Sequence, residues 1–182
     1  DWSIFATGTP KAREQWYAEM TGPAGAAFTA CTLLALQDAP LDMAYFYTAE
    51  PQGFGLFSQY GEPRKSYYAL KAFRQLLETP NRVRCSGSQA GQLNIAAGLN
   101  EERTSLNVLV SSFRHPATAM DLMIKGIPWA GKTRCEVLEI GREADWKVRE
   151  LQSFSGSEFR VDLGLEPASI RLLRFQQLRG LK

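Results

Sequence analysis

The sequence predicts two parts of different fold class, an α/β part followed by an antiparallel β-sandwich. Up to about residue 80, helical segments alternate with one short apolar run. Beyond residue 80, seven short segments with alternate apolar residues follow one another at roughly regular intervals, which is typical of a sandwich. A chain of 182 residues is long enough for one sizeable domain or two small ones. We therefore expect two domains, 1–80 and 81–182.

Three helices are expected in the first part. Thr9 followed by Pro10 is typical of a helix start, since the hydroxyl can cap the free amides and proline suits the first helical position. The segment 26–37 is apolar on nearly every side, which indicates a helix covered on more than one face. The segment 66–78 carries apolar residues at helical spacing and ends before Pro80. These elements cannot easily bury their own apolar faces, so the first part needs a partner.

An aromatic stretch separates the second and third of these helices. The residues 41–48 form a short apolar run, flanked by Pro40 and Pro51, and this pattern predicts a buried strand. A glycine-rich loop follows, and we assign Phe46 and Phe57 to the core. The order helix, strand, loop, helix is an α/β pattern.

The seven expected strands lie in the second part. Gly, Asn, Ser or Pro separates them, and Pro167 falls before the last strand, where proline is tolerated. They are 93–100, 105–113, 120–127, 134–141, 146–152, 158–165 and 170–175.

Charge and hydropathy exclude several function classes. The net charge is +2, and basic and acidic residues are mixed along the chain, so no stripe suits a nucleic acid. The longest apolar run, 25–36, is too short to span a membrane. No secretory signal opens the sequence and its first residue is Asp1, which we expect to be an internal position of a longer protein. The compartment stays open between cytoplasmic and secreted.

No cofactor or metal is expected. Cys31, Cys85 and Cys135 are too far apart for a metal or redox motif; buried free thiols are favoured, and a bridge between Cys85 and Cys135 stays open. His115 is the only histidine, so we place it on a loop surface. The sequence from Gly126 to Thr133 satisfies the phosphate-loop spacing, but no helix is expected after it, and we interpret the match as chance.

The stretch after the aromatic run resembles a known enzyme family. It reads "GFGLFSQYGEPRKSYYALKAFRQL", and Gly53, Phe54, Gly55 and Leu56 begin the match. Further matches are Gly61, Pro63, Lys65, Tyr67, Tyr68, Ala69 and Phe73, whereas Ser66 replaces a usual proline. This text is similar to the eighth strand, loop and last helix of glycoside hydrolase family 39, and "PASIRLLRF" resembles the last strand of the β-sandwich in that family.

The resemblance implies the final two β/α units of a (β/α)8 barrel followed by its appended antiparallel β-sandwich. Such barrels carry their chemistry on loops after the strands. Trp2 would follow the seventh strand, and Tyr45, Tyr47 and Glu50 would lie at the end of the eighth, so we expect these four residues to bind substrate. Flat aromatic faces with polar edges suit sugar rings. Glu50 can also be read as a solvated loop carboxylate.

A retaining glycosidase needs two carboxyl groups about 5–5.5 Å apart. In the resembled family both are glutamates, and the nucleophile is the glutamate of a "TEW" motif that is followed by a small or polar residue. The glutamate and tryptophan of that motif align with Asp1 and Trp2, and Ser3 follows them. Asp1 therefore occupies the nucleophile position by resemblance, although its shorter side chain also fits a simple terminal residue. The acid would lie in the six preceding barrel units, so we expect the 182 residues alone to be inactive.

The favoured function is part of a glycosidase that hydrolyses O-glycosidic bonds of an oligo- or polysaccharide, with carbohydrate as the partner molecule. The rival is a non-catalytic carbohydrate-binding or protein-interaction β-sandwich module. A third possibility is that another chain supplies the missing N-terminal barrel segment, because the apolar helix 26–37 would otherwise be exposed.

Overall fold

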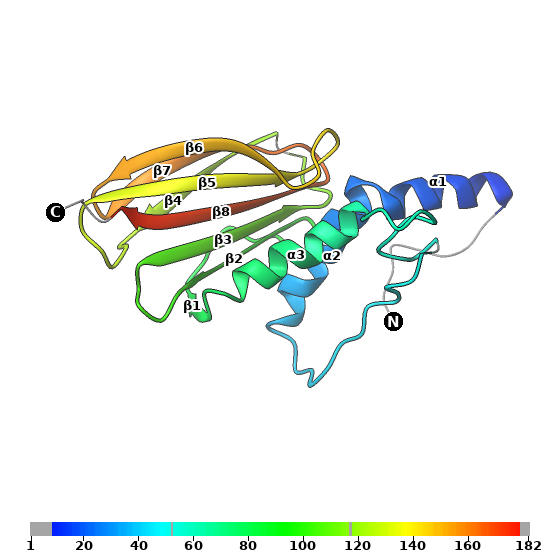
Figure 1. The fold of residues 1–182 in the computed structure, drawn as a ribbon, viewed down its shortest axis with the longest axis horizontal. Coiled ribbons are helices and arrows are strands. Elements are labelled where there is room, and N and C mark those ends of the chain that lie inside the picture. The colour runs from blue at the N-terminus through cyan, green and yellow to red at the C-terminus, as the bar shows by residue number, and fades with distance from the viewer. Residues whose placement is uncertain (1–8, 52, 117, 179–182) are drawn as a thin grey trace.

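The computed structural model describes residues 9–51, 53–116 and 118–178, and within them it places three helices before eight strands (Figure 1). The helices are α1 (Pro10–Thr21), α2 (Pro23–Leu36) and α3 (Lys65–Leu76). The strands are β1 (Asn81–Val83), β2 (Leu93–Leu99), β3 (Ser105–Ser112), β4 (Ala119–Lys125), β5 (Lys132–Ile140), β6 (Lys147–Ser155), β7 (Glu158–Gly164) and β8 (Ser169–Leu178).

Every strand pair is antiparallel. Six strands form one sheet in the order β1-β2-β3-β8-β5-β6, and β4 pairs with β7 in a separate two-stranded ribbon. Each of the seven segments that the sequence predicts as a strand overlaps one, from β2 to β8, so the existence of those strands is confirmed. The short edge strand β1 was not predicted, because three residues are too few to show alternation.

The six-stranded sheet has an apolar core on each face. Alternation along β3 directs Leu109 toward α2 and α3, and its neighbours Val108 and Val110 toward the β4–β7 ribbon. On the helix face, the core combines alanines of α2 and α3 with Leu138, Ile140, Ile170 and Leu172. On the ribbon face, it combines Ile124, Val161 and Leu163 with Leu173 and Phe175. The helices and the sheet therefore share one apolar layer, and Figure 1 shows α2 and α3 beside the sheet.

The two N-terminal helices follow the sequence signals closely. Thr9 caps α1 by accepting a bond from the Ala12 amide at 3.4 Å, as predicted. The helix α2 packs between α1, α3 and the sheet, which confirms that it is covered on more than one face. Ser111 of β3 donates to the Ala27 carbonyl at 2.8 Å. Gly25 admits the tight turn, since a Cβ there would lie 2.0 Å from the Met20 carbonyl oxygen.

The predicted strand at 41–48 is wrong. These residues form an irregular segment, and Tyr45 is 73% exposed and Tyr47 54% exposed. A strand needs a neighbour that satisfies its backbone groups along its length, and none of the eight strands of the described chain pairs with 41–48. Phe46 and Phe57 are only partly buried and belong to neither core, so their assignment to the core is also wrong.

All three cysteines are free thiols, so the bridge that the sequence left open between Cys85 and Cys135 is absent. Cys31 and Cys135 are buried, in agreement with the favoured interpretation, and Cys85 is exposed. Among the described helices, none has the length and hydropathy that crossing a bilayer requires.

Candidate functional site

The connection between α2 and α3 carries the residues that the sequence selects as ligand-facing. In Figure 1 it is the cyan trace that runs away from the sheet before it returns to α3. Tyr45, Tyr47 and Tyr60 are exposed on it, and the exposed Tyr17 lies nearby on α1. Large exposed aromatic side chains gathered on one segment are unusual for a monomeric surface and indicate an interaction site.

Arg64 ties this connection to the helices. Its Nη1 donates to the carbonyl oxygens of Gly53 at 3.3 Å and Gly55 at 3.2 Å, and its Nη2 donates to the Tyr17 hydroxyl at 2.7 Å. One guanidinium group thus joins α1, the glycine-rich loop and the start of α3. Sequence reasoning missed this role, although Arg64 stands between Pro63 and Lys65 in the quoted motif.

Tyr47 is held at its edge while much of its surface stays open to solvent. Its ring meets Phe54 at a centroid distance of 6.1 Å, and Phe54 meets Trp16 of α1 at 4.6 Å, both edge to face. The backbone of Thr48 donates to the Phe54 carbonyl at 3.4 Å and accepts from the Leu56 amide at 3.1 Å. The peptide bond between Tyr47 and Thr48 is cis. These contacts fix the loop around one exposed aromatic ring.

The other predicted ligand-facing residues are distributed as follows. Tyr45 and Glu50 are exposed on the same connection as Tyr47, and the Glu50 amide donates to the Thr48 hydroxyl at 3.5 Å. Asp1 and Trp2 lie outside the described residues. The structure thus places three of the five predicted site residues on one exposed segment.

This arrangement offers apolar aromatic faces beside one carboxylate. Tyrosine rings can stack on the C–H faces of a sugar, and the Glu50 carboxylate can accept hydrogen bonds from its hydroxyls. Groups of three or more His, Cys, Asp or Glu residues with metal-binding geometry are absent from the described chain.

Two other sequence features are the phosphate-loop spacing that ends at Thr133 and the single histidine, His115. Gly131, with φ of +93°, turns the chain into β5, so Lys132 and Thr133 begin a strand and not the helix that a phosphate loop requires. The interpretation of this match as chance agrees with the fold. His115 lies partly buried in the connection between β3 and β4.

Comparisons of the whole chain find similarity in structure only. No family model and no curated protein matches the sequence. A glucosidase from Croceicoccus marinus matches with a TM-score of 0.80 and 18% identity, over 86% of this chain and 42% of the glucosidase. A glycoside hydrolase family 39 enzyme from Xanthomonas axonopodis pv. citri matches with a TM-score of 0.68 and 14% identity, over 94% and 43%. A family 30 endoxylanase from Clostridium papyrosolvens matches with a TM-score of 0.66 and 12% identity, over 86% and 39%.

These matches confirm the predicted resemblance to the C-terminal portion of a family 39-like glycoside hydrolase, at the level of fold. The chain spans about two fifths of the length of the three enzymes.

Proposed function

We propose that this chain forms the C-terminal portion of a glycosidase that hydrolyses O-glycosidic bonds of an oligo- or polysaccharide. The observation that carries the proposal is the coverage of the structural matches, which take in 86–94% of this chain and only 39–43% of three glycoside hydrolases. A match that covers nearly all of one chain but less than half of the other is expected when the first chain corresponds to a part of the second.

The proposed architecture assigns 1–80 to the last two β/α units of a barrel and 81–182 to an accessory β-sandwich. The segment 41–48 supports this assignment, because it has the composition of a buried strand and yet most of its residues are exposed in the described chain. Leu41 and Met43 are the side chains that neighbouring barrel elements would cover. Sequence preceding Asp1, or a second chain, would supply those elements.

The proposed substrate site is the end of this segment. Tyr45, Tyr47 and Trp2 would offer aromatic faces to sugar rings, and Glu50 would accept hydroxyl groups. Asp1 would stand at the nucleophile position, with the general acid on the preceding part of the barrel. In this proposal the complete enzyme uses a retaining mechanism with two carboxyl groups, and the 182 residues alone are inactive.

The test compares this chain with a polypeptide that carries the sequence upstream of Asp1, using aryl glycosides as substrates. The longer protein is expected to hydrolyse them and the 182-residue chain is not. In the longer protein, Tyr47→Ala should raise KM up to about tenfold, the effect of one aromatic contact. Tyr60→Ala is the matched control, since Tyr60 is an exposed tyrosine of the same connection that lies outside the proposed substrate site. Hydrolysis by the 182-residue chain that survives substitution of Asp1 and Glu50 would contradict the proposal.

A non-catalytic carbohydrate-binding module is the second candidate, and the polar cavity on the sheet described below favours it. The two functions differ in where substitutions act. Glycan binding by this chain that is lost on changes in the sheet and kept in Tyr47→Ala, together with an inactive longer protein, would favour the module.

A further inference from the structure

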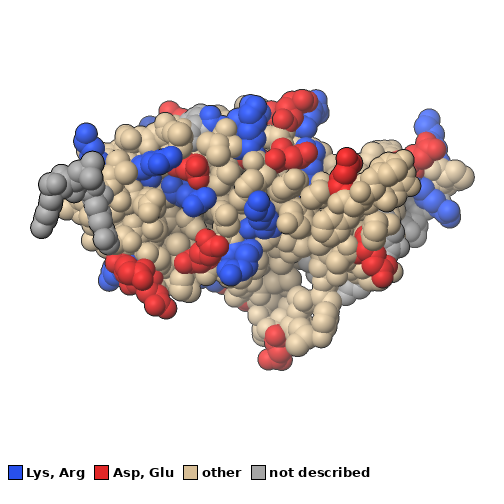
Figure 2. Space-filling view, viewed as in Figure 1, with Lys and Arg blue, Asp and Glu red and all other residues tan. Residues whose placement is uncertain are grey.

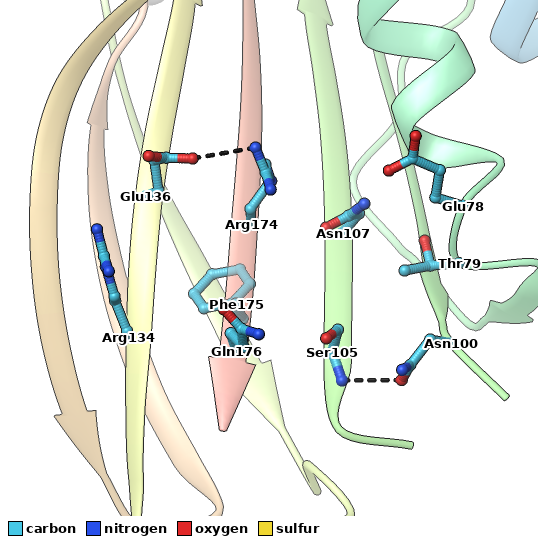
Figure 3. Close-up of a pocket in the computed structure, with 10 residues that line it drawn as sticks. All are labelled: Glu78, Thr79, Asn100, Ser105, Asn107, Arg134, Glu136, Arg174, Phe175 and Gln176. Atoms are coloured by element: carbon cyan, nitrogen blue, oxygen red, sulfur yellow. Dashed lines mark hydrogen bonds and ion pairs between the residues drawn. The ribbon is translucent and has the colours of Figure 1, made fainter. Parts of the chain in front are cut away.

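A polar cavity of about 330 Å³ lies on the helix-facing side of the six-stranded sheet, beyond the C-terminal end of α3 (Figure 3). Its volume is within the range of small-molecule sites. Side chains of β3, β5 and β8 form its floor, and the segment after α3 forms one wall. In Figure 1 this end of the sheet is remote from the aromatic connection between α2 and α3.

The sheet face changes from apolar to polar at this point. Along β8, Ile170 and Leu172 are buried under the helices, whereas Arg174 and Gln176 on the same face line the cavity. Along β5, Leu138 is buried and Glu136 and Arg134 line the cavity. The polar residues begin where α3 ends, so they form a recess that the helix does not fill.

Several of the lining side chains are held in place by bonds to one another or to nearby backbone groups. Arg174 pairs with Glu136 at 3.2 Å, and the Nδ2 of Asn107 donates to the Gln75 carbonyl at the end of α3 at 2.8 Å. The Oδ1 of Asn100 accepts from the amides of Thr104 and Ser105, each at 2.8 Å. Figure 3 shows the Arg174 and Asn100 contacts. Groups that are already oriented lose little entropy when a ligand binds.

Several polar groups of the recess remain available to a ligand, among them Arg134 and Asn107. Within the described chain, the Arg134 guanidinium makes no ion pair and the Oδ1 of Asn107 accepts no hydrogen bond. Asn107 is only 6% exposed, so this oxygen lies at the base of the recess and not on open surface. The recess also contains a second carboxylate, that of Glu78, which Figure 3 shows on the opposite wall from Arg134. Glu136 is paired with Arg174, so an incoming carboxylate would find free charged donors beside Arg134 and not near Glu78.

We propose that this recess binds a hexuronic acid residue of a saccharide. Arg134 holds the carboxylate through charge-assisted bonds, and Asn107 and Gln176 bind ring hydroxyl groups. The choice of a saccharide rests on the proposed function, whereas the recess and its unpaired guanidinium do not. A site here would anchor an acidic glycan on the sheet, away from the aromatic connection.

The test is a nuclear magnetic resonance titration of the ¹⁵N-labelled 182-residue chain with glucuronate, glucose and acetate at equal ionic strength. Glucuronate is expected to shift the side-chain amide signals of Asn107 and Gln176, and to bind at least about tenfold more tightly than glucose, as a hydrogen bond to a charged group implies. Arg134→Gln should abolish this preference. Arg142→Gln, which removes an equal charge from the exposed turn between β5 and β6, should retain it.

Three results would overturn the proposal: glucose binding as tightly as glucuronate, acetate producing the same shifts at the same concentration, or none of the ligands moving these signals. The spectrum of Arg134→Gln itself reports whether that variant is folded. Hydrolysis is not measured, so failure of this site and failure of the proposed glycosidase are distinguishable.

Discussion

Replacing Glu139 by Leu is expected to destabilise the fold by about 3–5 kcal/mol, because it leaves a buried arginine without its partner. Glu139 lies on β5 with its side chain 3% exposed, and Arg171 of β8 approaches its Oε1 at 2.8 Å with a side chain 9% exposed. Arg149 of β6 donates to the other carboxylate oxygen. Burial lowers the pKa of Arg171, and the nearby carboxylates of Glu139 and Glu166 act in the opposite direction.

The same strand contains a matched control three residues away. Glu136 also pairs with an arginine of β8, Arg174, at 3.2 Å, but the two side chains are 25% and 45% exposed. Solvent screens a pair of this kind, so Glu136→Leu should cost less than about 1 kcal/mol. Since the whole stability of a domain is about 5–15 kcal/mol, the expected difference between the two variants is large.

Urea unfolding followed by circular dichroism gives the free energy of unfolding of each variant. The double variant Glu139→Leu with Arg171→Met should recover at least about 2 kcal/mol relative to Glu139→Leu, because it removes the orphaned charge. If Glu139→Leu costs no more than Glu136→Leu, water reaches the Glu139 cluster in solution and the assumption of a desolvated charge is wrong.

Three further predictions concern other parts of the fold. Leu109→Ala should cost about 2–5 kcal/mol in the same assay, since Leu109 is fully buried between sheet and helices; a cost below about 1 kcal/mol would contradict that packing. In the native chain only Cys85 should react readily with a thiol reagent, and Cys85→Ser should remove that reaction, because the other two cysteines are buried. Hydrogen bonds from Arg82 hold the pKa of Asp38 below its usual value, so this pair stabilises the fold above the unfolded-state pKa and the effect is lost as the pH falls through the folded-state pKa. A carboxyl titration by nuclear magnetic resonance should show a lower midpoint for Asp38 in the parent chain than in Arg82→Gln.

Local patterns predicted the elements of this fold better than their arrangement. Alternation is a property of a single strand, so seven strands could be placed from the sequence. The pairing of β8 between β3 and β5 joins residues 30 or more positions apart in the chain, and no local pattern encodes it. The close approach of β2 to the end of α3 is likewise invisible, although Gly98 marks it: a Cβ there would lie 1.9 Å from the Thr79 carbonyl oxygen.

The error at 41–48 has a different origin. Apolar composition predicts burial, but burial also requires a surface to pack against. The helix α2 has such a surface, because it lies between two helices and a sheet. Tyr45 and Tyr47 have none in the described chain that covers them, and they stay exposed. Basic and acidic residues are interspersed on the face in Figure 2, and the expectation that no nucleic acid is bound stays a prediction.

The two candidate sites differ in how far a sequence can reveal them. Tyr45, Tyr47 and Glu50 can be selected from the sequence, because the stretch around them contains more aromatic residues than a half-buried strand needs. Arg134 and Asn107 occupy alternate positions of strands, where a polar residue ordinarily indicates a solvent-facing side chain. They lie in a recess because α3 ends at Leu76, whereas the sheet that it covers extends further, along β8 to Leu178. Only the packing of the helix on the sheet shows which strand residues stay uncovered. Polar residues at alternate positions of a strand can therefore be recognised as a binding site only when the position of the covering helix is known.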